Sequence, residues 1–291
     1  MDARELISEV RRLEIRTRMV VDEVVGGAYR SRFKGRGIEF DEVREYVPGD
    51  DVRDIDWNVT ARMGAPFVKK YVEERELHVL LAVDVSASGL FGSGAKTKIR
   101  TQAEIAALLA LSAVRNHDKV GMVTFSDRIE SVLPMRSGRG HVLRMLRDLV
   151  ATEPLGRATD LAFALDKIRK SQKKRAVIFL ISDFLDARER WSENLRMLSR
   201  RHDLVMICVS DPAEAEWGVS GIWNVADAEN LSAGTFRATK KFRENFAANF
   251  RREREELEAE AARANAGFIP LVCGEDVVLP MMRFFAKRRS R

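Results

Sequence analysis

The oxygen-bearing side chains with the clearest spacing in this chain of 291 residues come directly after long apolar runs. The run LHVLLAV (77–83) ends in DVSAS (84–88), and the run AVIFLI (176–181) ends in Ser-Asp (182–183). A third polar group, GRATD (156–160), lies between them at the start of an expected helix. Carboxylates and hydroxyls suit a hard cation such as Mg²⁺ or Mn²⁺, and not zinc or copper. The residues therefore favour binding of a divalent cation.

These side chains must be brought together by the elements that end beside them. From residue 77 onwards, apolar runs alternate with helical stretches, which is typical of a parallel sheet with helices on both faces. Ligands of an open parallel sheet lie outside the carboxyl ends of its strands, so the three polar groups are expected at one edge. The sequence predicts an α/β fold with a doubly wound, mainly parallel sheet. Strands are expected in LHVLLAVDVS, KVGMVTFS, 128–133, RAVIFLISDF, DLVMICVSD and GFIPLVC, and helices near 97–116, 139–150, 158–170, 189–201, 240–265 and 276–288.

Residues 1–76 differ in pattern from the rest and are expected to form an N-terminal helix followed by a small β element. Apolar and polar residues alternate in RDIDWNVTAR (53–62), which predicts a half-buried strand with Trp57 as a core anchor. The second predicted domain, residues 77–291, contains a less regular stretch at about 212–240 that is punctuated by glycine. We interpret this stretch as a hairpin insertion.

A simpler interpretation of each polar residue is a helix N-cap. Ser, Thr and Asp commonly cap helices, and Thr159 or Asp160 would cap the helix that follows them. Taken together, however, D-x-S-x-S after a buried strand, with Thr and Asp at later strand ends, is much more specific than any single cap.

The combined pattern resembles the metal-ion-dependent adhesion site of von Willebrand factor A domains. The resemblance implies that five positions hold Mg²⁺ or Mn²⁺: Asp84, Ser86, Ser88, Thr159 and Asp183. It also implies that an acidic residue of a bound partner completes the coordination. Asp84 and Asp183 are expected to act through water, and Asp160 to lie just outside the ligands.

A second resemblance covers the stretch GGAYRSRFKGRGIEFDEVREYVPGDDVRDIDWNVTAR (26–62). This stretch is similar to the signature of the bacterial family called "domain of unknown function 58". The matching positions are Arg30-Ser31, Gly35, Gly37, Phe40, Arg44-Glu45-Tyr46, Pro48-Gly49-Asp50-Asp51, Arg53 and Ile55-Asp56-Trp57, with Asp211-Pro212 later in the chain. The resemblance implies a MoxR-type AAA+ ATPase partner and a chaperone-like role in assembling or activating a client protein complex. Many relatives carry membrane segments before the signature, whereas this chain starts with a charged stretch, so a cytoplasmic member without a membrane span is expected.

Charged residues are unusually dense in this signature. On a short β element they would form a ladder of cross-strand ion pairs. Exposed pairs contribute only ~0–1 kcal/mol each, so a docking role for a partner is favoured over a purely structural one. The candidate docking residues are Arg44, Asp50, Asp51, Arg53 and Asp56.

The amino-acid composition narrows the remaining classes of protein to which this chain could belong. Cys208 and Cys273 are the only cysteines, which excludes a disulfide scaffold, and both lie in apolar runs where burial is expected. The formal charge of +6 would suit a nucleic-acid binder, but acidic and basic residues are interspersed and no aromatic residues interleave with a basic stripe. No nucleic-acid partner is therefore expected.

An enzyme is the other alternative. Haloacid-dehalogenase-like phosphoryl-transfer enzymes, which depend on Mg²⁺, also place Asp after their first strand and after a later one. They need a second Asp two residues after the first as acid and base, where this chain has Ser86. We therefore predict a non-catalytic, metal-dependent protein-interaction module without catalytic residues.

Overall fold

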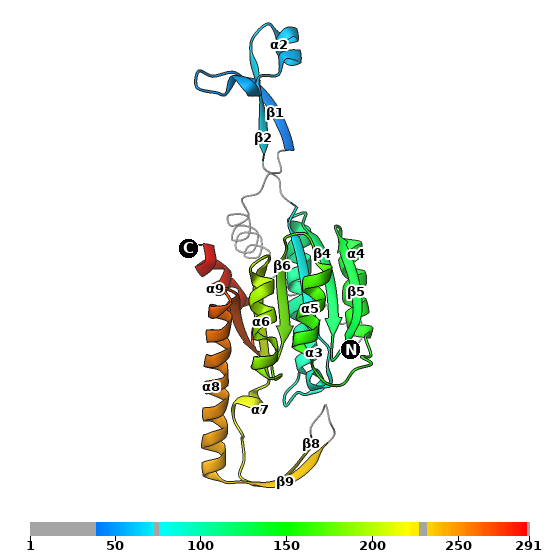
Figure 1. Cartoon of the computed structure of the whole chain (residues 1–291), viewed down its shortest axis with the longest axis vertical. Coiled ribbons are helices and arrows are strands. Elements are labelled where there is room, and N and C mark those ends of the chain that lie inside the picture. The colour runs from blue at the N-terminus through cyan, green and yellow to red at the C-terminus, as the bar shows by residue number, and fades with distance from the viewer. Residues whose placement is uncertain (1–38, 73–75, 227–231, 290–291) are drawn as a thin grey trace. The chain divides into compact units, whose positions relative to one another are not determined.

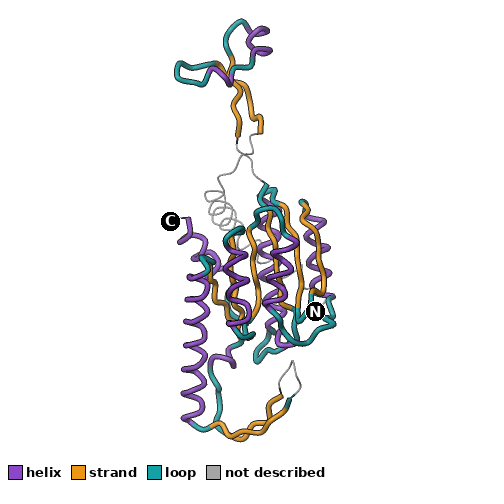
Figure 2. Tube along the Cα trace, in the orientation of Figure 1, coloured by secondary structure: helices purple, strands orange, loops and turns teal. Residues whose placement is uncertain are grey.

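The computed structural model describes residues 39–72, 76–226 and 232–289 (Figures 1 and 2). The chain divides into a small unit, Tyr29–Glu76, and a larger unit that contains Leu77–Arg291. The strands of the larger unit's main sheet are β3 (His78–Asp84), β4 (Lys119–Phe125), β5 (Ile129–Arg136), β6 (Val177–Ser182), β7 (Asp203–Ser210) and β10 (Gly267–Val272). Its longer helices are α3 (Lys98–Arg115), α4 (Arg139–Ala151), α5 (Leu161–Ser171), α6 (Arg188–Ser199), α8 (Lys240–Arg263) and α9 (Val278–Arg289). The helix predicted near the N-terminus lies outside the described residues.

The main sheet has the order β10-β7-β6-β3-β4-β5. All neighbouring strands are parallel except β5, which runs antiparallel to β4. The predicted doubly wound, mainly parallel sheet is therefore confirmed. The chain builds outwards from β3 through β4 to β5 and then returns to β6 on the other side of β3, so the strand order reverses between β3 and β6. Parallel sheets bind ligands at such a reversal, outside the carboxyl ends of the strands.

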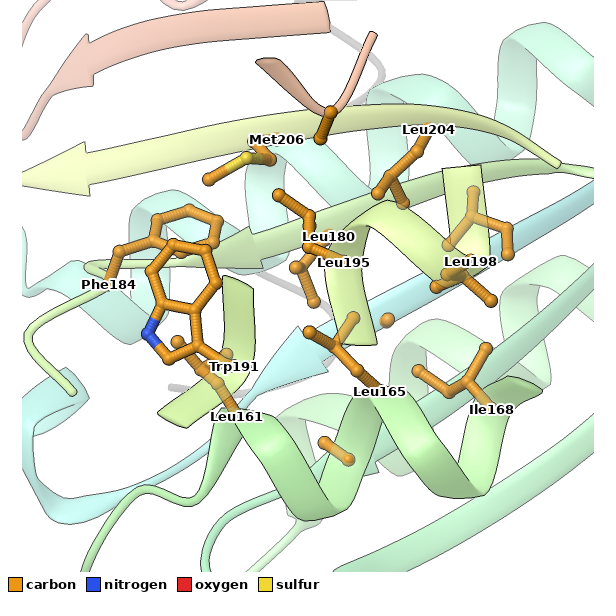
Figure 3. Packing of buried hydrophobic residues seen from close by; sticks show 14 of the residues in the cluster. Leu161, Leu165, Ile168, Leu180, Phe184, Trp191, Leu195, Leu198, Leu204 and Met206 are labelled. Atoms are coloured by element: carbon orange, nitrogen blue, oxygen red, sulfur yellow. The ribbon is translucent and has the colours of Figure 1, made fainter. Parts of the chain in front are cut away.

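Both faces of the sheet are covered, because successive residues of each strand point to opposite faces. On one face, Leu180 of β6 packs with Leu165 of α5 and Trp191 of α6 in a continuous apolar core (Figure 3). On the other face, Phe285 of α9 packs edge-on against Phe179, with the ring centroids 6.3 Å apart, and α3 lies against β3 and β4. Burial on both faces explains why the strands appear in the sequence as continuous apolar runs. Cys208 and Cys273 are buried with free thiols, as predicted.

The small unit contains the antiparallel strands β1 (Glu39–Glu45) and β2 (Phe67–Val72). Between them lie a short 3₁₀ helix, η1 (Val52–Asp54), and a helix, α2 (Trp57–Met63). The prediction of a strand over 53–62 is thus wrong.

Capping explains why a helix forms there despite the alternating pattern. The Asp56 carboxylate accepts the backbone N–H groups of Asn58 and Val59, at 3.0 and 3.2 Å, which satisfies two donors of the first turn. Gly64 ends the helix with φ of 74°, a left-handed conformation that glycine adopts without strain. Trp57 is 66% exposed on this helix, so its prediction as a core anchor is also wrong.

A separate hairpin, β8 (Gly221–Ala226) paired with β9 (Ala233–Ala238), lies between the short helix α7 (Pro212–Ala215) and α8. A two-stranded hairpin is marginal by itself. Trp217 supplies the missing packing, because its ring contacts four other aromatic rings, those of Trp223, Phe236, Phe242 and Phe246. These contacts attach the hairpin to the start of α8. None of the helices in the described part of the chain combines the length and apolar composition that crossing a bilayer requires.

Candidate functional site

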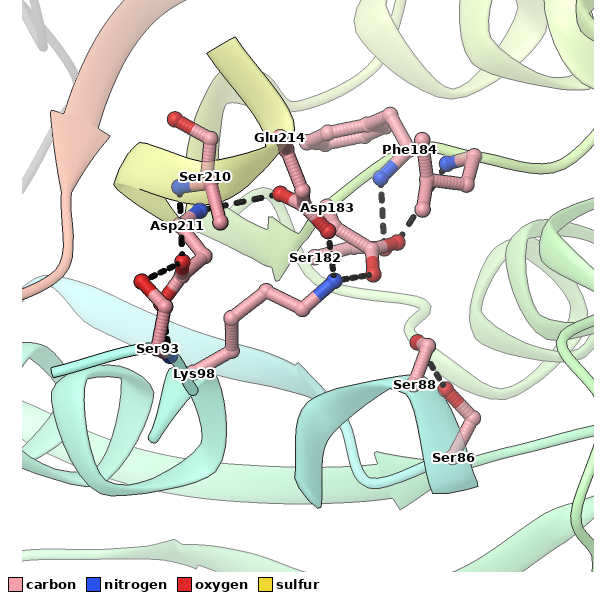
Figure 4. A network of polar contacts seen from close by, with 12 residues as sticks. Ser86, Ser88, Ser93, Lys98, Ser182, Asp183, Phe184, Ser210, Asp211 and Glu214 are labelled. Atoms are coloured by element: carbon pink, nitrogen blue, oxygen red, sulfur yellow. Dashed lines mark hydrogen bonds and ion pairs between the residues drawn. The ribbon is translucent and has the colours of Figure 1, made fainter. Parts of the chain in front are cut away.

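Asp84 and the two serines after it lie at the carboxyl end of β3. The Asp84 side chain is buried, and its Oδ1 accepts the Ser86 N–H at 2.9 Å. The hydroxyl oxygens of Ser86 and Ser88 lie 3.1 Å apart (Figure 4). The Ala87 N–H donates to the carbonyl of Arg157 at 2.9 Å, so this loop is attached directly to the loop that carries Thr159.

Asp183 reaches the same edge from β6. The Ser182 hydroxyl donates to Oδ2 of Asp84 at 2.6 Å and so joins the ends of the two strands. The chain then turns at Phe184, whose φ of 58° lies in the left-handed region that costs a non-glycine residue about 1–2 kcal/mol. Burial of its ring against Trp191, at a centroid distance of 6.0 Å, holds this turn in place. Packing of the core thus determines where the Asp183 carboxylate lies.

Thr159 lies half-buried in the loop between α4 and α5. The backbone bonds of its neighbours, Ala87 N–H to the Arg157 carbonyl and Asp160 N–H to the Ser126 carbonyl, hold this loop beside the ends of β3 and β4. Gly156 allows this loop to approach, because a Cβ there would overlap the carboxylate of Asp127 and the hydroxyl of Ser126. Glu130 accepts the Gly156 N–H at 2.8 Å and anchors the loop further.

Asp160 has a structural role that the capping interpretation anticipated. Its Oδ1 accepts the Phe163 N–H at 2.9 Å as the N-cap of α5, and its Oδ2 pairs with Arg190 at 3.0 Å. Its backbone N–H donates to the carbonyl of Ser126 at 3.1 Å, which keeps it next to Thr159 at the edge of the sheet.

The structure adds a cation that sequence reasoning missed. The Nζ of Lys98, the first residue of α3, lies 2.6 Å from Oδ2 of Asp183 and 2.6 Å from Oε1 of Glu214 (Figure 4). Its side chain is 1% exposed. Burial opposes its charge, but the two carboxylates outweigh this and raise the pKa of Lys98 overall. Lys98 is therefore a buried, charged ammonium at the candidate site.

Glu214 and Asp211 hold that ammonium in a wider network. Asp211 is fully buried; it accepts the Ser93 N–H at 2.9 Å and the Ala213 N–H at 2.9 Å, while Glu214 accepts the Asp211 N–H at 2.9 Å. Asp211 and Glu214 form a capping box at the start of α7, and the spacing D-x-x-E after an apolar run is a sequence signal that could have found them. The ion pairs of Lys98 with Asp183 and Glu214 have no such signal in the sequence, because the partners are far apart in the chain.

The charge of Asp183 acts on Asp84 at the neighbouring strand end. Burial, followed by the negative charge of Asp183, raises the pKa of Asp84 to about 7, against the hydrogen bonds from Ser182 and Ser86. An added positive charge would relieve this cost.

The donor set can be compared with the needs of a metal ion. No cluster of three or more His, Cys, Asp and Glu side chains suited to a metal occurs in the described residues, so a cation here would depend on hydroxyls. Two carboxylates and the hydroxyls of Ser86, Ser88 and Thr159 are hard oxygen donors, which fit Mg²⁺ or Mn²⁺. Both oxygens of Asp84 already accept hydrogen bonds, Oδ1 from the Ser86 N–H and Oδ2 from the Ser182 hydroxyl.

Among the described residues, the candidate docking side chains make ion pairs and helix caps, and Asp56 also pairs with Lys69 of β2 at 3.5 Å. Arg44 makes a two-bond ion pair with Asp50 beyond the end of β1, at 2.8 and 2.7 Å. Asp51 accepts the Arg53 N–H at 2.9 Å as the cap of η1, and Asp56 caps α2. These carboxylates satisfy their own loops, because short helices and turns here need acceptors for their free N–H groups.

An open pocket of about 530 Å³ begins beside Asp183 and Glu214. Its far wall is α8, which contributes Phe246 and Phe250 together with Arg254. The Arg254 guanidinium donates to the Ser210 hydroxyl at 2.9 Å, and Phe250 lies under it at 5.3 Å. The candidate site therefore continues into a partly apolar recess.

Residues 42–256 match the family model described as "Protein of unknown function DUF58". The chain belongs to the DUF58 family. An uncharacterised protein of Mycobacterium tuberculosis and another of Mycobacterium bovis are each 32% identical to this DUF58 chain over 99% of its length and 92% of their own. An uncharacterised protein of Mycobacterium avium is 30% identical over 54% of this chain and 94% of its own.

Solved structures similar to this DUF58 chain include the conserved hypothetical protein BatB of Bacteroides thetaiotaomicron, which is 16% identical with a TM-score of 0.47 and aligns over 74% of this chain and all of its own. A von Willebrand factor type A protein of Catenulispora acidiphila is 10% identical with a TM-score of 0.40, over 77% of this chain and 44% of its own. The fold assignment rests on the sheet order of the DUF58 chain itself.

Proposed function

We propose that this DUF58 protein is a non-catalytic, metal-dependent protein-interaction module. The observation that carries the proposal is the convergence of Asp84, Ser86, Ser88 and Asp183 at the carboxyl ends of β3 and β6, beside the loop that carries Thr159. The Ser182 hydroxyl and the Asp84 carboxylate that it contacts are 98 residues apart in the chain. Helix capping does not account for Ser86, whose side chain makes no capping hydrogen bond at η2 (Ala87–Leu90).

The hydroxyls of Ser86, Ser88 and Thr159 would hold Mg²⁺ or Mn²⁺, with Asp84 and Asp183 acting through water. When bound, the ion would supply a positive charge that accepts a carboxylate from a partner protein. Asp84 accepts hydrogen bonds from the Ser86 N–H and the Ser182 hydroxyl and would balance the charge of the ion together with Asp183, and Asp160 fixes the start of α5. The recess beside Asp183 would receive neighbouring side chains of the same partner.

We also propose that the chain acts in the cytoplasm with a MoxR-type AAA+ ATPase, in chaperone-like assembly or activation of a client complex. The support for this partner is the family signature, which the small unit carries. In that unit, the side chains of Val47, Val52, Trp57 and Met63 are each more than half exposed, as a docking surface requires.

The first experiment is a Mn²⁺ titration followed by electron paramagnetic resonance of the free ion. The wild-type protein is compared with Asp84→Ala, with Asp183→Ala and with Asp166→Ala, a control carboxylate on α5 that pairs only with Arg169 and Lys170 in the ion pairs of its helix. We expect saturable binding of one ion that is lost in the first two variants and kept in the control. Equal binding in all four proteins would place the metal elsewhere and refute the assignment.

The partner is tested with purified proteins. The chain is immobilised and the MoxR-type ATPase of the same bacterium is passed over it in Mg²⁺ or in EDTA. Retention in both solutions by wild type and Asp84→Ala alike would assign the ATPase contact to a surface other than the metal edge. Absence of retention in either solution would refute the partnership.

A further inference from the structure

Lys98 differs from the other cationic side chains at this edge because it is buried between two carboxylates. Its Nζ lies 2.6 Å from Asp183 and 2.6 Å from Glu214, and it is 5.9 Å from the centre of the Phe91 ring. Only 1% of the side chain is exposed, so solvent does not screen these contacts.

This ammonium occupies the same carboxylate that the proposed metal site uses. Lys98 donates to Oδ2 of Asp183 at 2.6 Å and the Leu185 N–H donates to Oδ1 at 3.3 Å, so a water on a metal ion would compete with both donors for this carboxylate. The ammonium and a divalent cation would also repel each other, because both are positive and the surroundings are buried. The two cations therefore compete for Asp183.

Glu214 gives the ammonium a second position. If the Lys98 side chain left Asp183, it would still be paired with Glu214, so the exchange would not leave a buried charge without a partner. Glu214 is itself held at α7 through its bond to the Asp211 N–H, and Asp211 through its bond to Ser93. Lys98 can therefore adopt two arrangements: paired with both Asp183 and Glu214, or paired with Glu214 alone.

We propose that Lys98 is the resident cation of this site, and that a divalent cation binds only by displacing its ammonium from Asp183. The inference rests on the proposed metal-dependent function and specifies how the site is regulated: its affinity for metal is set by competition with a side chain of the same protein. Without metal, the ammonium offsets part of the negative charge of these carboxylates, and the competition raises the apparent dissociation constant for the metal.

The test measures Mn²⁺ affinity, with Mn²⁺ chloride as the only ligand. The decisive variant is Lys98→Met/Glu214→Gln, which removes one positive and one negative charge and so keeps the net charge of the wild type. The introduced glutamine retains a side-chain oxygen for the Asp211 N–H, and thermal unfolding by circular dichroism establishes that the variant is folded. Lys98→Met alone, Lys170→Met as an exposed lysine control on α5, and each protein combined with Asp84→Ala complete the set.

We expect the double variant to bind Mn²⁺ at least about tenfold more tightly than the wild type, within the range of about 5–150-fold typical of coupled sites. Lys170→Met is expected to match the wild type, and Asp84→Ala to abolish binding in every background. If the double variant binds Mn²⁺ with wild-type affinity in an Asp84-dependent manner, the competition is refuted and the proposed function stands. If none of the proteins binds Mn²⁺, the metal-dependent function is refuted and the inference with it.

Discussion

His202 lies in the turn between α6 and β7, and both of its ring nitrogens are buried without a hydrogen-bond partner among the described residues. The side chain is 3% exposed. Burial, followed by the positive charges of Arg201 and Arg175, lowers its pKa from 6.5 to about 4. The ring is therefore neutral in the folded protein at neutral pH, and protonation favours the unfolded chain.

The pKa of His202 determines the sign and size of a pH effect on stability. Because the folded pKa lies below the unfolded one, the stability is fully present above pH 6.5 and is lost as pH falls towards about 4. The difference between the unfolded and folded pKa values lowers the free energy of unfolding by about 1.4 kcal/mol at pH 5.5 and by about 2.5 kcal/mol at pH 4.5, relative to pH 7.5. These figures are for His202 alone.

The assay is urea unfolding at pH 7.5, 5.5 and 4.5 for wild type, for His202→Leu and for His117→Asn, which replaces an exposed histidine. The three proteins contain the same carboxylates, so the difference between variants isolates the histidine. We expect His202→Leu to gain stability relative to wild type by the amounts above as pH falls, and His117→Asn to follow the wild type. A constant difference between His202→Leu and wild type from pH 7.5 to 4.5 would refute the argument that burial keeps this ring neutral.

Two further predictions concern the frame of the site. Gly156→Ala is expected to destabilise the protein by about 1 kcal/mol in urea unfolding and to weaken Mn²⁺ binding, because a Cβ there would displace the carboxylate of Asp127 and the buried hydroxyl of Ser126. Gly140→Ala, where nothing lies within 4 Å of the added Cβ, is the control, and equal effects would contradict the steric reason. Trp191→Ala is expected to cost about 3–5 kcal/mol of unfolding free energy by thermal or urea unfolding, because the ring is fully buried. Trp57→Ala, at an exposed position, is expected to leave the unfolding of the larger unit nearly unchanged; a comparable loss there would contradict the assigned burial.

The regular elements of the larger unit were predictable because their signals are local. A strand that is buried on both faces appears in the sequence as a continuous apolar run, as in β3, β6 and β7. The helices between these strands show apolar residues at the spacing of a helical turn, so both kinds of element could be predicted from the residues. The positions of Asp84 and Asp183 follow as well, since the ends of parallel strands share one edge.

The same kind of reasoning failed in the small unit. Ile55, Trp57 and Val59 alternate with polar residues, as in a half-buried strand, yet Asp56 and Gly64 supply the two ends of a helix. The alternation is a weak signal over so few residues, because it stabilises a strand only if one face of that strand is buried. Trp57 is 66% exposed, so that burial is missing here. Capping bonds form within a few residues and do not need that burial.

The sequence alone thus determines which oxygen donors meet at the sheet edge, because periodicity and strand order are properties of neighbouring residues and of a few topological rules. Only the tertiary structure decides how those donors are neutralised. Lys98 and Asp183 are 85 residues apart, and nothing near either residue indicates that the lysine will be buried between Asp183 and Glu214. The raised pKa of Asp84 has the same origin, since burial and the charge of Asp183 act on it only once β3 and β6 are paired. Charge interactions depend on distance and on the surrounding solvent, and both are set by the folded chain.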